Sequence, residues 1–350
     1  MRRVTKFAAA GIASAALALT ATACGSSSKD SDSDSAKSGA LKVGVAYDVG
    51  GRGDHSFNDS AAAGLDKAKT DFGIEIKELT AKTSDTEADR EQRLEDLADA
   101  GYNPVIGVGF AYGDSIKAAA AKYPKTTFAI VDSVVDAKNV DSITFTEEQS
   151  SYLAGVAAAL KTKDNKVGFI GGVDIPLINK FEAGFRQGVT ETNPKVTVTT
   201  QYLTSGSDLS GFSDPAKGKA AAQGMLDKGI DVVYAAAGSS GNGAIEAVAG
   251  KTGAWAIGVD SDQYAQTGLV KYQKSILTSA LKNVDVAVYD AVKSVKDGSP
   301  LTGTQTYDLA KDGVGLATSG GFIDDIKSQL DAAKQKIVSG DIKVDTTVKK

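Results

Sequence analysis

Residues 41–73 constrain the fold more than any other part of this 350-residue chain. They begin with an apolar run at 43–47, whose length and β-branched content are typical of a buried strand. A polar loop rich in glycine follows at 48–58, and apolar residues then recur at helical spacing from 61 to 72. Strand, loop and helix form the first part of a βαβ unit, in which ligands bind at the carboxyl ends of the strands. We therefore expect this loop to form half of a ligand-binding cleft.

Apolar runs and helical patterns continue to alternate along the rest of the chain. Further strands are predicted at 74–76, 105–109, 127–131, 139–145, 167–172, 196–198, 231–235, 254–259 and 275–281, with a short strand pair within 303–316. Helices are predicted at 87–100, 115–122, 147–155, 178–191, 215–228, 284–296 and 323–337. Such alternation predicts an α/β fold, with mostly parallel sheets covered by helices on both faces.

Two successive α/β blocks of similar size indicate two Rossmann-like lobes with a cleft between them. The chain is 42% hydrophobic and long enough to fold into two domains. We expect the N-terminal lobe to contain residues 41–145 and about 260–308. The C-terminal lobe is then expected to contain 146–259 and about 309–340, so that crossover hinges lie near the ends of these segments.

Composition excludes several classes of function. The formal net charge is -5 and the chain has no basic stripe with interleaved aromatic residues, which argues against a nucleic-acid partner. The single cysteine, Cys24, and the single histidine, His55, exclude the common structural zinc sites and Cys–His catalysis. No G-x-S-x-G elbow is present to supply a serine nucleophile. We expect neither a metal nor a cofactor.

The N-terminus has the layout of a secretory signal. Arg2, Arg3 and Lys6 precede an apolar run at 7–23, and Cys24 follows it in the sequence Ala-Thr-Ala-Cys-Gly, which resembles the lipoprotein box of bacteria. We therefore expect a signal peptide at 1–23, lipidation of Cys24 and a flexible tether over 24–40, rich in glycine, serine and aspartate. An uncleaved membrane anchor and a plain signal with an incidental cysteine are the alternatives.

Three carboxylates stand where predicted strands end. Asp48, Asp132 and Asp260 each follow an apolar run, and each alternatively serves as a turn residue or helix N-cap. Phe57 and Asn58 bring a ring and an amide to the end of the first strand, although Phe57 alternatively packs as a staple onto its own helix. The shared position at strand ends favours ligand contact for these residues.

Five motifs, in this order along the chain, resemble the basic membrane protein (BMP) family. They are Asp48 with residues 55–59, 150–155, 171–176 with 181–185, 258–263 and 278–283. The resemblance implies a type I periplasmic-binding-protein fold and a lipoprotein that binds the substrate of an ABC importer. It covers the chain from about residue 41 to the C-terminal helix.

The resemblance also implies site residues. Phe57 and Phe212, from opposite lobes, are expected to sandwich a nucleobase, whose edge Asp132 would contact. By the same resemblance Gly238 would let backbone approach the sugar. The residues expected around the ribose are Asp48, Asp260 and Lys282. A lysine at a predicted helix start is disfavoured by the helix dipole, which supports a specific role for Lys282.

We accordingly expect a monomeric, lipid-anchored, extracytoplasmic protein that is not an enzyme. It would bind nucleosides, purine nucleosides in particular, between its lobes and deliver them to the permease and ATPase of an ABC importer. Two or more carboxylates near the sugar disfavour a nucleotide, because its phosphate would meet like charge. The alternatives are a sugar-binding or ligand-sensing protein of the same fold, or a secreted nucleoside or sugar hydrolase that uses its aspartates.

Overall fold

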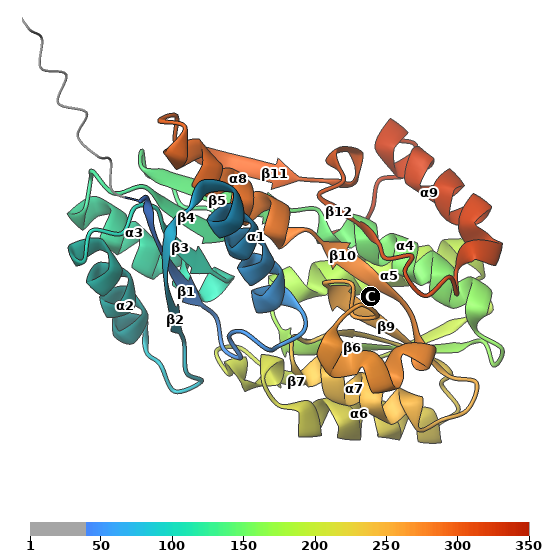
Figure 1. Ribbon diagram of the computed structural model, residues 1–350. Coiled ribbons are helices and arrows are strands. Elements are labelled where there is room, and N and C mark those ends of the chain that lie inside the picture. Colours follow the sequence, from blue (N-terminus) through green and yellow to red (C-terminus); the bar gives the residue numbers. More distant parts are fainter. Residues whose placement is uncertain (1–39, 350) are drawn as a thin grey trace, which may run out of the picture. The chain divides into compact units, whose positions relative to one another are not determined.

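The computed structural model of the protein describes residues 40–349 (Figure 1). The predicted signal peptide, Cys24 and all but the last residue of the predicted tether lie outside the described residues. Within 40–349 the strands form two six-stranded sheets, called sheet A and sheet B below.

Sheet A is built from parallel strands. In spatial order they are β11 (Gly303–Tyr307), β5 (Val140–Phe145), β4 (Phe128–Val131), β3 (Val105–Val108), β1 (Lys42–Tyr47) and β2 (Glu75–Thr80). Side chains of β1 alternate between its two faces, as the period of a strand requires. Val43, Val45 and Tyr47 join one buried cluster and Ala46 joins another. Both faces of the sheet are therefore buried, which is why the central strands read as continuous apolar runs.

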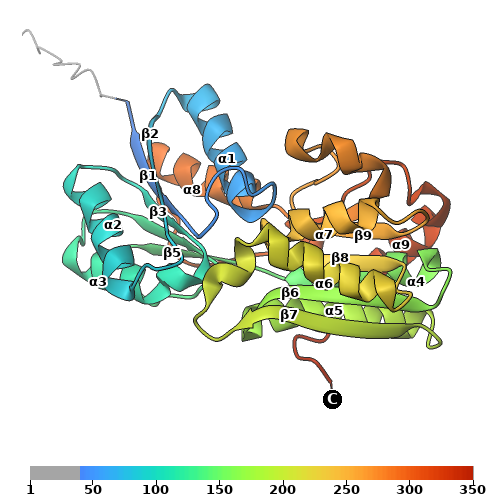
Figure 2. The same ribbon diagram turned by 90° about the horizontal axis from the view of Figure 1, so that it is seen from below.

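Two pairs of helices cover the faces of sheet A (Figure 2). One pair is α1 (Phe57–Phe72) with α8 (Val284–Lys296), and the other is α2 (Glu87–Asp99) with α3 (Gly113–Lys122). Thr86 caps α2 through a reciprocal capping box with Asp89, and Gly73 ends α1 in the left-handed conformation. Sheet A with these helices is the N-terminal lobe.

Sheet B has the same arrangement, with one antiparallel strand at its edge. In spatial order its strands are β12 (Val314–Leu316), β10 (Ile276–Lys282), β9 (Trp255–Asp260), β8 (Val232–Ala236), β6 (Lys166–Asp174) and β7 (Thr197–Ser205). Strand β12 is the antiparallel one. Sheet B with its helices is the C-terminal lobe.

The helices of the C-terminal lobe pack in pairs on either face of sheet B (Figure 1). They are α4 (Glu147–Lys161) with α5 (Pro176–Thr192), α6 (Pro215–Asp227) with α7 (Ser240–Ala249), and α9 (Lys327–Ser339), which packs on α4. A Cβ atom at Gly184 or Gly188 would collide with a backbone carbonyl of α4, so these glycines permit the close approach of α4 and α5. Short 3₁₀ segments complete the described chain: η1 (Phe110–Tyr112), η2 (Leu209–Phe212), η3 (Thr267–Ser275), η4 (Leu309–Lys311) and η5 (Asp324–Ile326).

The chain passes between the lobes at three places, and one of them differs from the prediction. The crossings lie between β5 and α4, between β10 and α8, and between β11 and β12. The predicted boundary near residue 260 is wrong, because β10 continues sheet B by pairing with β9 and the chain leaves this sheet only after Lys282. The predicted strand pair within 303–316 is also wrong. Strand β11 pairs with β5 in sheet A, whereas β12 pairs with β10 in sheet B.

Candidate functional site

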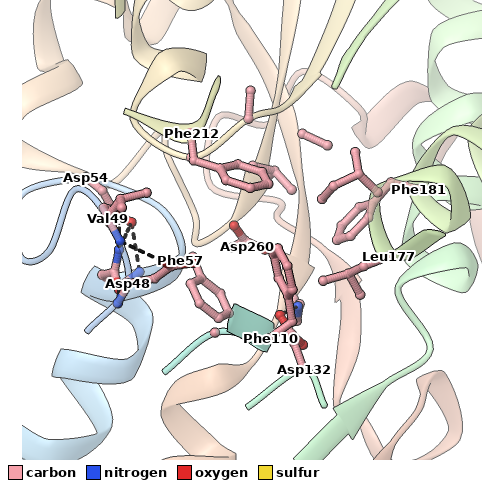
Figure 3. Close-up of a pocket in the computed structure, with 18 residues that line it drawn as sticks. Asp48, Val49, Asp54, Phe57, Phe110, Asp132, Leu177, Phe181, Phe212 and Asp260 are labelled. Atoms are coloured by element: carbon pink, nitrogen blue, oxygen red, sulfur yellow. Dashed lines mark hydrogen bonds and ion pairs between the residues drawn. The ribbon is translucent and has the colours of Figure 1, made fainter. Parts of the chain in front are cut away.

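A cavity lies where the carboxyl ends of strands from both sheets meet (Figure 3). In each sheet the strand order reverses beside the first strand, between β1 and β3 and between β6 and β8, which is the topological switch point at which open α/β sheets bind ligands. The eight residues predicted for ligand binding all line this cavity: Asp48, Phe57, Asn58, Asp132, Phe212, Gly238, Asp260 and Lys282. Their sequence positions span more than two hundred residues, so the fold brings together what the sequence separates.

Asp48 and Asn58 fix the first loop of the N-terminal lobe. The Asp48 carboxylate accepts a hydrogen bond from the Val49 N–H at 2.8 Å, and the Asp48 N–H donates to Asn58 Oδ1 at 3.2 Å. Asn58 Nδ2 in turn donates to the Val49 carbonyl and to Asp54. The Asn58 amide therefore holds the loop with both its oxygen and its nitrogen. These contacts position the loop beside the cavity that Asn58 also lines.

Asp54 is a lining residue that the sequence analysis missed. Its buried carboxylate accepts hydrogen bonds from the N–H groups of Ser56, Asn58 and Asp59, at 2.8–3.0 Å. These are donors that the first turn of α1 would otherwise leave unpaired. Asp54 thus caps α1 from two residues before Ser56. The signal available in the sequence was an Asp shortly before a helix, although Ser56 is an equally good cap type and makes no capping bond in the structure.

A buried ion pair joins the lobes at one side of the cavity. Lys282 ends β10, and its Nζ lies 2.5 Å from Oδ2 of Asp132, which directly follows β4 in a left-handed conformation at φ 70°. The Lys282 side chain is only 2% exposed, so it is not a solvated surface lysine. It ends β10 two residues before α8 begins, and not within the helix. Asp132 Oδ1 is buried and has no hydrogen-bond partner within the described protein, which leaves an acceptor for a ligand.

Asp260 stands at the end of β9, opposite the loop of the N-terminal lobe. Its Oδ2 accepts a hydrogen bond from Ser56 Oγ at 2.7 Å, and its backbone is left-handed at φ 62°. Burial raises the pKa of Asp260 to about 6, although Lys282 and the Ser56 hydroxyl oppose the rise. Burial likewise raises the pKa of Asp48 to about 6, opposed by the hydrogen bond from Val49. Both carboxyl groups are thus poised to titrate just below neutral pH.

Lys282 keeps its charge despite burial. Burial alone would lower the pKa of its ammonium, but Asp132, Glu147 and Asp260 together raise it. The ammonium also lies 5.0 Å from the centroid of the Phe57 ring, within the range of a cation–π contact. The cavity therefore combines a fixed cation, four carboxylates and an aromatic face.

Aromatic rings reach the cavity from both lobes (Figure 3). Phe57 comes from the first turn of α1, and Phe212 ends η2 in the C-terminal lobe. Two glycines seat Phe212. A Cβ at Gly172 would overlap its ring, and a Cβ at Gly238, whose φ is 53°, would lie 2.8 Å from its carbonyl oxygen. The contact with Phe212 therefore accounts for a glycine at position 238 without any ligand. The close approach of the Gly238 backbone to a sugar stays a prediction.

Further apolar lining residues were not predicted from the sequence. They include Phe110, from η1, and Leu177, Ile178 and Phe181, from the start of α5. The α5 residues follow β6 as Phe57 follows β1, so the strand–loop–helix argument applied to the second lobe would have found them. Together these groups suit a ligand with flat apolar faces and several hydroxyl donors. Within 40–349, no cluster of His, Cys, Asp and Glu side chains has the make-up of a metal site.

Comparison with known proteins identifies the family. The model of the PnrA-like substrate-binding proteins of ABC transporters matches residues 41–347, which is most of the chain. The chain belongs to this family. The predicted resemblance to the BMP family is thereby confirmed. This PnrA-like chain is therefore a substrate-binding protein of an ABC transporter.

Two curated relatives and one solved structure agree with this assignment. A CD4+ T-cell-stimulating antigen of Listeria monocytogenes is 38% identical over 317 residues, covering 86% of this chain and 87% of the relative. The ABC transporter nucleoside-binding protein BmpA of Lactococcus lactis is 38% identical over 325 residues, covering 87% of this chain and 89% of the relative. The solved structure is a solute-binding protein of an ABC transporter system from Aeropyrum pernix K1. It superposes with a TM-score of 0.75 at 30% identity and covers 87% of this chain and 93% of its own.

The solved structure also confirms the predicted fold class, two α/β lobes of the periplasmic solute-binding type. Among the helices of residues 40–349, none combines the length and the hydropathy that crossing a membrane requires.

Proposed function

We propose that this protein is a lipid-anchored receptor that binds nucleosides between its lobes and delivers them to the permease of an ABC importer. The observation that carries the proposal is the composition of the cavity. A ring from each lobe, Phe57 and Phe212, faces a space that four buried carboxylates and Lys282 also line. A nucleoside has the matching chemistry: a base with two aromatic faces, and a sugar rich in hydroxyl groups.

The two parts of a nucleoside would be recognised by different forces. Stacking on aromatic side chains contributes about 1–3 kcal/mol per base and accepts any base. Carboxylates accept hydrogen bonds from ribose hydroxyls, and Asp48 and Asp260 supply two such groups. The unpartnered Asp132 Oδ1 would accept from a donor on the ligand, and that donor would relieve the cost of a buried, unpaired acceptor. The nucleoside-binding relative in Lactococcus lactis supports this choice of ligand.

The charge of the cavity favours nucleosides over nucleotides. Asp48, Asp54, Asp132 and Asp260 line it, against a single lysine whose charge Asp132 already balances. A phosphate would therefore meet uncompensated negative charge and lose its hydration at the same time. We expect inosine or adenosine to bind and the corresponding monophosphates to be rejected.

The anchor is proposed from Cys24 and the residues around it. Two acyl chains, at about 0.8 kcal/mol per buried CH₂, suffice to hold a folded domain at a membrane. The chain would then sit on the extracytoplasmic face as a monomer, and meet its permease there. The mass of the mature protein tests this point. A diacylglycerol adduct that is lost in Cys24→Ser supports the anchor, and an unmodified Cys24 contradicts it.

One incubation separates a receptor from a hydrolase. The protein is mixed with inosine or adenosine, denatured, and the released small molecules are identified by mass. Recovery of the intact nucleoside supports the receptor, whereas free base and ribose contradict it. Thermal-shift measurements with nucleosides, pentoses and hexoses then separate nucleoside binding from sugar binding, because only a base stacks on the rings.

A further inference from the structure

Three consecutive carbonyl groups of the N-terminal lobe each accept a hydrogen bond from a side chain of the C-terminal lobe. Asn242 Nδ2 donates to the Asp54 carbonyl at 3.0 Å and Gln263 Nε2 donates to the His55 carbonyl at 3.0 Å. Ser261 Oγ donates to the Ser56 carbonyl at 2.7 Å. These three side chains and three carbonyls are called the latch below. They connect the lobes directly, with no ligand between them.

The loop presents these carbonyls because its own lobe holds it rigid. The N–H groups in and after the loop bond to carboxylates of the same lobe, Ser56 to Asp54 and His55 to Asp59. His55 adopts the left-handed region at φ 57°, which turns the loop sharply. Its ring lies against Gly268 of η3, where a Cβ would collide with Nε2. The loop is thus shaped to face the C-terminal lobe.

The donors are equally fixed on their own side. Gln263 is buried, its Oε1 accepts from the Val259 N–H at 3.1 Å, and its N–H donates to Ser279 Oγ at 3.1 Å. Its Nε2 also lies 3.3 Å from Asn242 Oδ1, which couples the two amides. Because these bonds orient the amides within one lobe, little side-chain freedom is lost when the lobes meet.

The latch side chains do not line the cavity. Asn242, Ser261 and Gln263 are absent from the residues around it, whereas Asp54 and Asp260 beside them are present. A ligand in the cavity therefore leaves the latch donors untouched. Bonds that exist only when the lobes are together shift the equilibrium toward closure, whichever ligand is present.

We propose that Asn242, Ser261 and Gln263 hold the lobes together in the ligand-free protein and so set the affinity of the site without touching the ligand. The part of the proposal that concerns affinity rests on the proposed function. The apparent dissociation constant equals the intrinsic constant divided by the closed fraction. Weakening the latch should therefore raise the dissociation constants of different ligands by one common factor. A residue that touches the ligand would instead change them unequally.

The test exchanges donors for acceptors of the same shape. Asn242→Asp with Gln263→Glu keeps the oxygen that accepts from Val259 and places a carboxylate oxygen against the loop carbonyls. Gln273→Glu is the matched control, because Gln273 Nε2 donates to the Tyr264 carbonyl within one lobe at 2.6 Å. Asn242→Asp alone is the second variant, since Asn242 lies in the first turn of α7, where an acidic side chain is favoured.

Closure is measured by the distance between spin labels on the full chain. Cys24→Ser removes the single native cysteine, and Lys117→Cys on α3 with Ala220→Cys on α6 places one label at an exposed site of each lobe. Without ligand, the latch variant should lose the short-distance population that the parent and the control retain. The dissociation constants for inosine and uridine should both rise by the same factor, about tenfold or more.

Two results would overturn the latch: an unchanged distance distribution in the ligand-free variant, or a rise in dissociation constant no larger than that of Gln273→Glu. The labels need no ligand, so they decide the latch even if the parent protein binds no nucleoside. A parent protein that binds no nucleoside would contradict the proposed function and leave the latch to be decided by the label distances.

Discussion

Lys282 Nζ lies 2.5 Å from Asp132 Oδ2, and this buried ion pair joins the last residue of β10 in one lobe to the end of β4 in the other. It stands directly before the second crossing between the lobes. The pair therefore links the cavity to this crossing, and its remaining acceptor, Asp132 Oδ1, has no hydrogen-bond partner within the described protein.

Removing the cation should destabilise the protein strongly. Lys282→Met leaves Asp132 buried without a counter-charge, which typically costs about 3–5 kcal/mol of the free energy of unfolding. Adding Asp132→Asn should recover most of this loss, because the charge is then gone as well. Urea unfolding at pH 7, followed by circular dichroism, measures both. Lys293→Met is the control, since that lysine pairs with Asp297 in solvent. Equal stability of Lys282→Met and the parent would contradict the account.

The two rings should contribute to affinity separately. Phe57→Ala and Phe212→Ala are each expected to weaken inosine binding by about 1–3 kcal/mol, the value of stacking one base on one ring. Titration calorimetry measures the change. Phe322→Ala is the matched control, because that ring packs on Trp255 at 4.9 Å and does not line the cavity. If either cavity variant binds like the control, that ring is not part of the site.

Affinity should fall as the solution is acidified through pH 6. Burial raises the pKa values of Asp48 and Asp260 to about 6 in the ligand-free protein. A ligand that donates hydroxyl hydrogen bonds prefers the ionised carboxylates, so binding lowers both pKa values and weakens below pH 6. Calorimetry at pH 5.0 and 7.5 should show the difference, and Asp48→Asn should reduce it. A dissociation constant independent of pH would argue against carboxylate contact with the ligand.

Asp141 should make the protein less stable as pH rises, whereas ligand affinity is expected to increase with pH. This residue of β5 is buried, both its carboxylate oxygens lack a partner within the described residues, and burial with the nearby Asp290 raises its pKa to about 7. In the unfolded chain the group titrates near 4. Folding therefore favours the protonated form, and stability is lost as pH rises from about 4 to 7. Relative to the parent, Asp141→Asn should gain about 1–3 kcal/mol between pH 5 and pH 8 in urea unfolding. If the free energies of unfolding of Asp141→Asn and the parent differ by the same amount at pH 5 and at pH 8, this prediction is wrong.

The sequence predicted residues that line the cavity better than it predicted how those residues are held. Asp48, Asp132 and Asp260 could be found because each follows an apolar run, and strand ends meet at one edge of a parallel sheet. The partner of Lys282 could not be found, because Asp132 lies 150 residues away and a single sequence carries no record of contact. The contacts of Asn242 and Gln263 across the lobes could not be predicted for the same reason, because their partners lie 188 and 208 residues away.

The topology shows a similar limit. The long apolar strands and most helices were predicted near their observed positions, because their periodic patterns are strong. Strands β11 and β12 have five and three residues and a weak pattern, so nothing local showed that they belong to different sheets. Which sheet a short strand joins is decided by the neighbour it pairs with, β5 for one and β10 for the other.

The central claim is that one ligand lies between rings supplied by the two lobes. A crystal structure of the protein grown with inosine tests it most directly. The account predicts the base between Phe57 and Phe212, and ribose hydroxyls within hydrogen-bond distance of Asp48 and Asp260. Inosine bound elsewhere, or a cavity holding the sugar but no base between these rings, would contradict it.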